Sequence, residues 1–467
     1  MLNYQEVREQ DAELLRRYYA GCNYGLCEYS AGTKLMWRDV LHPTWAEAAG
    51  CLIIRNTIDG KVAYDYPVPG PEGDEDAALT LIENECIETG TPLAISVVPQ
   101  CKAGVLTARY PYVTVSNIRT WKDYIYRSGD LQNFAGRRYS GQRNHIKKFR
   151  AACPNAEFRP LAAADAAAVA GFWQDYDREF SKGEDPKAVQ ELAIAKRMLA
   201  MAGAPWFRCG GFFDGERLLS LALAEQCGDT LIIHIEKALY SYPGIYPAMV
   251  QAFARTFGGD VAWLNREDDA ADRGLRTSKL QYGPDHLGDK YRFQPHSELE
   301  YHVRAIPTLT TERLTLSPLT EADIPAYNAL VLDGDRNRWW GYDDVAGLGG
   351  PVEERSFFDV ARRDFENRLA VNFAVRLDGQ LIGEAVLYRF DYRGSAELGC
   401  RISREYAGHG YGTEAFAAAA EWGLYGVHLT RVVAKCFKEN EASRRMLSSC
   451  MRPNGEDDTF YYFEKRV

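Results

Sequence analysis

The sequence predicts an α/β protein built from three similar units, each a mixed, mostly antiparallel sheet flanked by helices. Two observations support this prediction. The same order of elements (two helices, three strands, a helix, a strand and a helix) occurs twice, with a period of about 155 residues. In both copies the first two strands are joined by an Asp-Gly pair, Asp214-Gly215 or Asp378-Gly379, which is typical of a tight hairpin turn.

Hydrophobic periodicity gives the expected elements in each copy. In the last third we expect helices at 320–332, 353–367, 412–425 and 440–450, and strands at 369–377, 380–390, 395–403, 430–437 and 459–465. In the middle we expect helices at 162–179, 187–202, 246–257 and 269–282, and strands at 206–213, 217–226, 229–238 and 261–266.

The first 150 residues are less regular. A hairpin at 51–66, a helix at 75–89 and a strand at 92–98 are consistent with a third, reduced copy. Residues 296–308 show no clear element, so we expect the domain boundary there. The predicted domains are therefore 1–300, with halves of about 1–150 and 151–300, and 308–467.

Composition narrows the class of protein. The chain has 467 residues, of which 46% are hydrophobic and 26% charged, and its net charge of −10 argues against a surface that binds polyanions throughout. No run approaches the ~18 apolar residues of a membrane span, and the charged N-terminus is unlike a secretory signal. Eleven cysteines without C-x-x-C pairs indicate free thiols and no metal site. We expect a cytoplasmic protein without a membrane span.

The most informative stretch is a glycine-rich loop between a strand and a helix. The strand at 395–403 runs into Gly408, Gly410 and Gly412 and then into an Ala-rich helix, an arrangement that favours anion binding at the helix N-terminus. A dinucleotide fingerprint would need glycine where Thr413 stands and an acid at the end of the next strand. A Walker A loop would need a lysine after the glycines. Both sites are excluded.

The loop Ala407-Gly-His-Gly-Tyr-Gly412 resembles the pyrophosphate loop of the GCN5-related N-acetyltransferases (GNAT), Arg/Gln-x-x-Gly-x-Gly/Ala. Asn440-x-x-Ser443 stands where that family contacts the pantetheine arm, and 311–331 resembles the start of the ribosomal-protein-alanine acetyltransferase branch. The departure is Ala407, which we expect to weaken binding. The resemblance implies acetyl-CoA as cosubstrate, bound by Cys400, Ile402, Ala407, Gly408, Gly410, Tyr411, Gly412, Thr413, Asn440 and Ser443.

The same resemblance implies acetyl transfer to a primary amine, on a small molecule or a protein N-terminus. No cysteine of the last domain lies beside a histidine, so we expect direct transfer without a covalent enzyme intermediate. Glu397 is the candidate base and Tyr461, or its neighbour Tyr462, the candidate acid. The alternatives are that water removes the proton and that these residues are ordinary strand side chains.

The first 300 residues have a resemblance of their own. Gly136–Phe149, Asn265–Asp269 and Gly274–Lys279 are similar to signatures of the phosphatidylglycerol lysyltransferase C-terminal-like family. That family implies two acetyltransferase-type folds in tandem, and its characterised branch transfers an amino acid from charged tRNA to a lipid with the help of a membrane-embedded half. This chain carries no such half, which speaks against a lipid acceptor.

Two further segments allow two interpretations each. The cations Arg137, Arg138, Arg143, Lys147 and Lys148 either contact phosphate, for example of aminoacyl-tRNA, or form a solvated face. The middle counterpart of the glycine loop, 240–246, has one glycine after a proline and is a poor pyrophosphate site. Glu236 before it is either a base or a carboxylate paired with Lys237 or Arg266.

Two rival functions therefore remain open. One is tRNA-dependent aminoacyl transfer centred on the N-terminal domain. The other is a non-catalytic module that binds acyl-CoA or peptide, suggested by Ala407.

Overall fold

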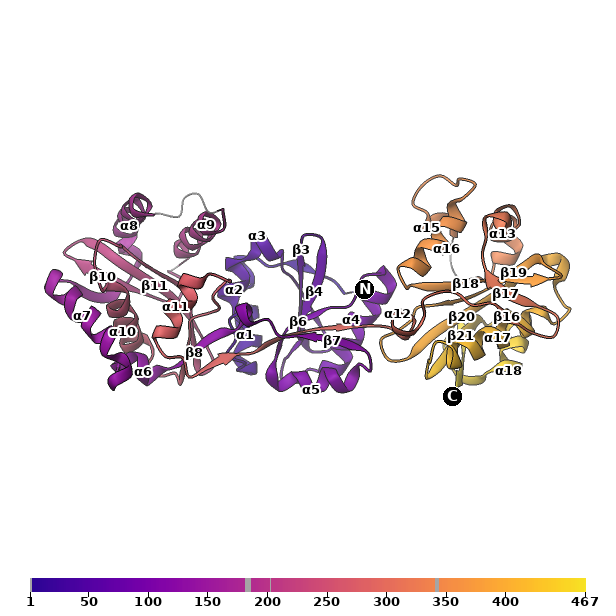
Figure 1. The fold of residues 1–467 in the computed structure, drawn as a ribbon, viewed down its shortest axis with the longest axis horizontal. Helices are drawn as coiled ribbons and strands as arrows, with labels where there is room; N and C mark the ends of the chain where they lie inside the picture. Colours follow the sequence, from indigo (N-terminus) through magenta and orange to yellow (C-terminus); the bar gives the residue numbers. More distant parts are fainter. Residues whose placement is uncertain (1, 181–185, 202, 341–343) are drawn as a thin grey trace. The chain divides into compact units, whose positions relative to one another are not determined.

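The computed structural model describes residues 2–180, 186–201, 203–340 and 344–467. They form an α/β protein with three sheets flanked by helices, which confirms the predicted fold class (Figure 1). The chain divides into two compact units. The first comprises Met1–Leu81, Ala94–Gly104 and Val115–Phe293, and the second Ile82–Leu93, Val105–Thr114 and Gln294–Val467.

The first sheet has the order β1-β2-β3-β4-β6-β15-β7, and β5 pairs with β3. The predicted hairpin is present, with Arg55 opposite Tyr64, and the predicted helix at 75–89 has the bounds expected. The strands are β1 Gln5–Glu6, β2 Thr44–Ala48, β3 Cys51–Ile58, β4 Lys61–Asp65, β5 Val68–Pro69, β6 Ile95–Pro99, β7 Val113–Ser116 and β15 Lys290–Pro295. The helices are α1 Ala12–Cys22, α2 Ala31–Met36, α3 Arg38–Leu41, α4 Glu75–Thr89 and α5 Gln100–Arg109.

The second sheet has the order β14-β8-β13-β12-β11-β10-β9, and α8 and α10 both pack on β11 (Figure 1). Its strands are β8 Asp123–Arg127, β9 Glu157–Pro160, β10 Phe207–Asp214, β11 Arg217–Cys227, β12 Thr230–Ala238, β13 Trp263–Asn265 and β14 His286–Gly288. Its helices are α6 Ser128–Asn133, α7 Ser140–Ala152, α8 Ala166–Glu179, α9 Pro186–Ala200, α10 Ile245–Phe257 and α11 Arg273–Gln281.

The two halves of the first unit are more closely joined than the sequence suggested. The second sheet already begins at β8, so the expected division near residue 150 lies too late. One buried core also contains side chains from both halves, among them Leu15 and Leu35 from the first and Phe172 and Leu221 from the second. Because they share this core, we expect the two halves to fold together.

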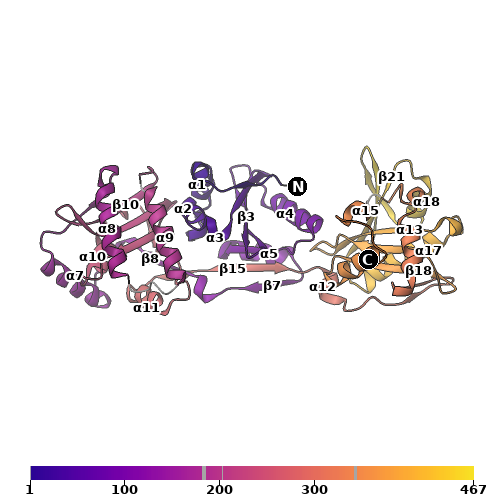
Figure 2. The same ribbon diagram turned by 90° about the horizontal axis from the view of Figure 1, so that it is seen from above.

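The third sheet has the order β16-β17-β18-β19-β20-β21-β23-β22. Figure 1 shows α13 and α16 on one face of this sheet and α17 and α18 on the other, and Figure 2 shows the same sheet from above. The strands are β16 Leu309–Thr310, β17 Thr315–Pro318, β18 Ala370–Leu377, β19 Gln380–Tyr388, β20 Ser395–Ile402, β21 Arg431–Phe437, β22 Arg452–Glu456 and β23 Phe460–Arg466. The helices are α13 Ile324–Val331, α14 Gly334–Asn337, α15 Asp344–Gly347, α16 Ser356–Glu366, α17 Tyr411–Tyr425 and α18 Glu441–Cys450.

The segment expected to lack structure contains a helix, α12 Glu298–His302. Leu299 is fully buried, and Leu299 and Val303 belong to the core under the third sheet. The expectation of an elementless boundary at 296–308 is therefore wrong, because these residues pack with the last domain. Across the described residues, every helix is too short or too polar to traverse a lipid bilayer.

Candidate active site

A cavity opens where two strands of the third sheet diverge. β20 and β21 pair in parallel only from Ser395 to Glu397 and from Arg431 to Val433, although both strands continue beyond these residues. The cavity between them has a volume of about 920 Å³ and is also lined by α17 and α18. A groove of this kind exposes unpaired strand edges to a ligand.

The glycine loop forms one end of this cavity. Gly408 and Gly410 both have φ of +82°, a conformation that glycine adopts without strain. In the described part of the chain, none of the backbone N–H groups from Gly408 to Thr413 has a hydrogen-bond acceptor. These N–H groups lie at the N-terminus of α17, where the helix dipole adds positive potential, so they form an anion site.

The sequence-predicted cofactor residues come together in this cavity. Asn440 is the N-cap of α18, and its Oδ1 accepts a hydrogen bond of 3.1 Å from the Ser443 N–H, so its amide NH₂ remains available to a ligand. Ala407 adds no polar group. All ten residues line the cavity, namely Cys400, Ile402, Ala407, Gly408, Gly410, Tyr411, Gly412, Thr413, Asn440 and Ser443.

Arg313 holds the loop from outside, a contact that the sequence analysis missed. Its Nε donates to Glu414 at 2.7 Å, its Nη1 donates to the His409 carbonyl at 3.0 Å, and its guanidinium lies over the Tyr411 ring at 4.7 Å. Burial raises the pKa of Glu414, but the hydrogen bonds from Thr311 and Arg313 lower it by more, so the pKa lies below its ordinary value. The Arg313–Glu414 pair therefore fixes the loop and the first turn of α17 together.

Glu397 lies on the other side of the cavity. On β20 its side chain is on the opposite face from that of the next residue, the buried Leu398. The Glu397 side chain is 12% exposed and accepts a 2.7 Å hydrogen bond from the Tyr388 hydroxyl. Lys435 Nζ lies 3.6 Å from Oε1, and Arg389 Nε lies 3.9 Å from Oε2. Burial, followed by the nearby Glu397 carboxylate, raises the pKa of Tyr388, so Tyr388 remains a hydrogen-bond donor.

Tyr461 does not face this site. On β23 it lies opposite Cys436, whereas the next residue, Tyr462, lies opposite Lys435. The Tyr461 ring contacts Arg444 at 4.5 Å and is not among the described residues that line the cavity. Tyr462 does not line it either, and its hydroxyl donates to Asp457 at 2.6 Å. The structure therefore does not bring the predicted acid to the predicted base.

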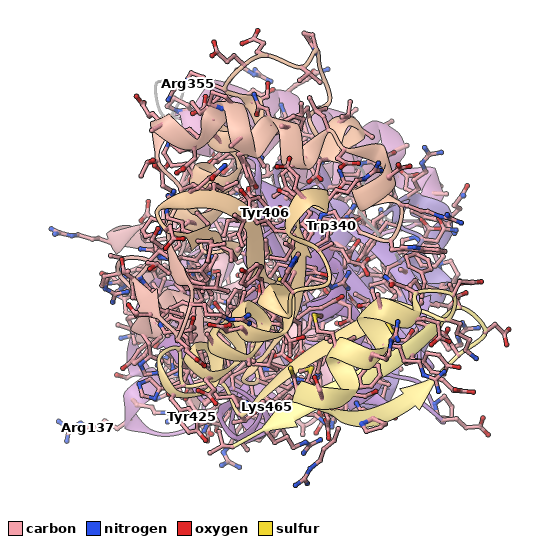
Figure 3. All side chains as sticks on the ribbon, turned by 90° about the vertical axis from the view of Figure 1, so that its right-hand side faces the viewer. Arg137, Trp340, Arg355, Tyr406, Tyr425 and Lys465 are labelled. Carbon is pink, nitrogen blue, oxygen red and sulfur yellow. The ribbon has the colours of Figure 1, made fainter. Side chains whose placement is uncertain are left out.

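A buried ion pair supports the Glu397 side of the cavity, and no local pattern in the sequence predicts it. Glu384 accepts hydrogen bonds from Arg401 at 2.6 Å and from the Tyr327 hydroxyl at 2.9 Å. The Arg401 guanidinium lies over the Trp340 ring at 4.3 Å, and the absent side chain of Gly399 lets that ring approach β20. Trp340, labelled in Figure 3, is thereby fixed as part of the cavity wall.

The equivalent loop of the second sheet is already filled. The Ser241 N–H and hydroxyl donate to the Glu179 carboxylate at 3.1 and 2.5 Å. At Gly244, a Cβ atom would lie 2.0 Å from the His145 carbonyl oxygen. The Ser241 donors are therefore already engaged by a protein carboxylate, and the backbone of α7 packs closely against Gly244. Glu236 pairs with Arg266 at 2.6 Å, as the structural interpretation of this residue expected.

The basic segment on α7 and before it is largely used within the protein. Arg138 pairs with Asp130 at 2.6 Å, and Arg143 donates to the carbonyls of Phe134 and Gly136. Exposed side chains remain, and Figure 3 shows one of them, Arg137, extending away from the ribbon. Arg138 and Arg150 are exposed but engaged, with Asp130 and the Ala156 carbonyl, whereas the exposed Arg137, Lys147 and Lys148 make no ion pair or hydrogen bond with the described residues.

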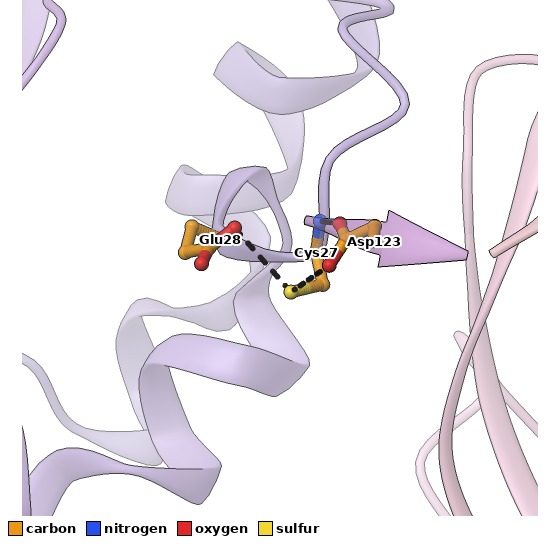
Figure 4. A group of neighbouring side chains, drawn as sticks. All are labelled: Cys27, Glu28 and Asp123. Atoms are coloured by element: carbon orange, nitrogen blue, oxygen red, sulfur yellow. Dashed lines mark hydrogen bonds between the residues drawn. The ribbon is translucent and has the colours of Figure 1, made fainter. Parts of the chain in front are cut away.

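One group of side chains in the described residues has the composition of a metal site. Cys27, Glu28 and Asp123 place their ligand atoms within 4.8 Å of one another (Figure 4). The Lys290 ammonium lies among them, at 2.6 Å from Asp123, 2.8 Å from Glu28 and 3.3 Å from the Cys27 sulfur. Because this ammonium already pairs with both carboxylates and occupies the space among the three ligand atoms, a metal ion would have to displace it.

Comparison with known proteins identifies the family. Residues 21–294 match the family described as phosphatidylglycerol lysyltransferase, C-terminal. The chain belongs to this family. Residues 313–450 match the acetyltransferase (GNAT) domain, so this phosphatidylglycerol lysyltransferase C-terminal family member is also a transferase of the GNAT type.

Two relatives of the last domain are described as N-acetyltransferases. The uncharacterized N-acetyltransferase YnaD of Bacillus subtilis (strain 168) is 34% identical over 148 residues, which cover 32% of this chain and 84% of YnaD. YoaA of the same organism, with the same description, is 24% identical over 144 residues, covering 30% of this chain and 80% of YoaA. A conserved protein of unknown function from Bacteroides thetaiotaomicron shares the fold. Its structure is 21% identical, with a TM-score of 0.58, and the match covers 63% of this chain and 99% of that one.

Proposed function

We propose that the last domain transfers the acetyl group of acetyl-CoA to a primary amine, on a small molecule or a protein N-terminus. The observation that carries this proposal is the row of unbonded N–H groups from Gly408 to Thr413 at the start of α17. Such a row binds phosphate oxygens, and the same cavity extends from this loop to Glu397. In this proposal, one extended ligand contacts both the glycine loop and Glu397.

In this proposal the chemistry is direct transfer. Acetyl-CoA supplies an activated acetyl group, and the chain orients the amine and removes its proton. Glu397 accepts that proton, directly or through one water, because its carboxylate lies in the cavity and is held in place by Tyr388. Since Tyr461 lies outside the cavity, we assign protonation of the departing thiolate to water.

The test combines binding with turnover. Isothermal titration should show that CoA binds the purified full-length chain, and a thiol-release assay with a panel of amines should show CoA formation with a 42 Da gain on one of them. CoA binding without thiol release from any amine would favour the non-catalytic module. The absence of CoA binding would overturn the proposal.

A second candidate function concerns residues 21–294. Their family match favours aminoacyl transfer from charged tRNA, with Arg137, Lys147 and Lys148 as the exposed cations that would contact phosphate. Replacing all three by glutamine should weaken tRNA retention on a filter and reduce its salt dependence. Equal retention by this variant and the wild type would remove this candidate role for the basic segment.

A further inference from the structure

The Glu397 carboxylate makes no close ion pair with the cations beside it. Tyr388 bonds one carboxylate oxygen, but Lys435 Nζ stays at 3.6 Å, beyond hydrogen-bond distance, and lies over the Phe460 ring at 5.3 Å. Within the described ranges, the Lys435 ammonium makes no hydrogen bond. Its side chain is 36% exposed, and Lys435 and Glu397 both line the cavity. The Glu397 carboxylate and the Lys435 ammonium therefore line the same cavity without a hydrogen bond between them.

Other acids that line the cavity are differently placed. Glu384 and Asp344 both contact the buried Arg401. Asp364 lies 3.5 Å from Arg363, and Asp335 pairs with Arg404. Each of these carboxylates is engaged by an arginine, whereas Glu397 is approached by the cations Lys435 and Arg389 at 3.6 and 3.9 Å.

A second cation, Arg389, stands at the same edge. It follows the last residue of β19 with φ of +51°, a left-handed conformation that is costly for arginine and is found more often at functional sites. Its other partner is Glu88, at 3.4 Å, and both side chains are about 40% exposed. Because exposed pairs of this kind contribute little, Arg389 can turn toward a ligand at Glu397.

We propose that the acceptor is an amino acid, a primary amine that carries its own carboxylate. This inference rests on the proposed acetyltransferase function. The ammonium of the acceptor pairs with Glu397 and its carboxylate pairs with Lys435, so each charge gains an opposite partner. A polyamine would instead bring further ammonium groups beside Lys435 and Arg389, which like-charge repulsion disfavours.

The reaction balances with this acceptor. The amine nitrogen attacks the thioester carbonyl, an N–C bond forms and the C–S bond breaks. Of the three ammonium protons, one stays on the amide, one is carried by the CoA thiol and one is released through Glu397. The product keeps its carboxylate on Lys435, and no oxidant or metal takes part.

The experiment compares matched acceptors on the full-length protein. Thiol release from acetyl-CoA is measured with the twenty common amino acids, their amides, spermidine and a tetrapeptide with a free N-terminus. We expect at least one amino acid to have a kcat/KM at least about tenfold above that of its own amide, because the amide lacks the carboxylate. Lys435→Met should bring this ratio close to one, and Lys435→Arg should retain a preference for the acid.

Lys438→Met is the matched control, since Lys438 directly follows β21, the strand that carries Lys435, but does not line the cavity. It should keep the wild-type ratio. Preference for an amide, spermidine or the peptide would overturn the inference, as would a wild-type ratio in Lys435→Met. Turnover of none of the amino acids by a chain that binds CoA would also overturn it while leaving cofactor binding intact. Failure to bind CoA in calorimetry would instead remove the proposed function itself, and this inference with it.

Discussion

The Tyr388 hydroxyl donates a 2.7 Å hydrogen bond to Glu397 from the neighbouring strand, where the two residues stand directly opposite each other. This contact restricts the carboxylate to one orientation toward the cavity. It also keeps a proton donor beside Glu397, because the pKa of Tyr388 is raised. A carboxylate held in this way is suited to repeated proton transfer at a fixed position.

Glu397→Gln should therefore lower the acetylation rate by about 10²- to 10⁴-fold, the usual effect of losing a positioned base. CoA affinity should be retained, since the loop N–H groups and Asn440 are unchanged. Thiol release measures the rate, and calorimetric titration measures the CoA affinity. Glu421→Gln, an exposed change on α17, is the control. Turnover of Glu397→Gln at the wild-type rate would show that water alone removes the proton.

Leu299 should be a stability determinant of the last domain, although it precedes the expected boundary. Its side chain is fully buried in the core under the third sheet. Leu299→Ala should destabilise that domain by about 2–5 kcal/mol, the range for a buried leucine. A fragment 294–467 should fold, and a fragment 305–467 should be less stable in urea. Equal unfolding midpoints for the two fragments would show that α12 contributes nothing.

His234 should titrate well above its ordinary pKa. It is buried, with Nδ1 2.9 Å from Glu267 and Nε2 3.7 Å from Glu225. Burial lowers its pKa, but the contacts with Glu225 and Glu267 raise it from 6.5 to about 9. Since the folded-state pKa is the higher one, the stabilisation is fully present below pH 6.5 and is lost as the pH rises through 9.

Nuclear magnetic resonance of ring-labelled histidine can follow this titration directly. The chain has eight histidines, and His234→Gln identifies the signal by its loss. We expect a midpoint near pH 9, and the thermal stability of the variant should depend less on pH between 6.5 and 9 than that of the wild type. A midpoint at or below the ordinary value would mean that the two carboxylates do not hold the proton.

Much of the last domain could be predicted from local pattern. Alternating apolar residues marked β18 to β21 within about two residues, and the three glycines after β20 marked the anion loop. The five-residue helix α12 was missed, since so short a helix has too few turns to show a periodicity.

Long-range features could not be predicted in this way. Arg313 and Glu414 are 101 residues apart, so no local pattern joins them. The face of Tyr461 depends on strand register, and a shift of one residue exchanges the two faces of a strand. For the same reason β8 could not be assigned to the second sheet, because its partners β13 and β14 lie more than a hundred residues away.

The most direct test of the account is calorimetric titration of CoA into the wild type and two glycine variants. Gly410→Asp places a negative charge in the anion loop, whereas Gly379→Asp makes the same change at a hairpin turn with similar φ, +84°, away from the cavity. We predict a loss of at least tenfold in CoA affinity, about 1.4 kcal/mol, for Gly410→Asp only. Equal affinity in the wild type and Gly410→Asp would contradict the assignment of this loop as the cofactor site.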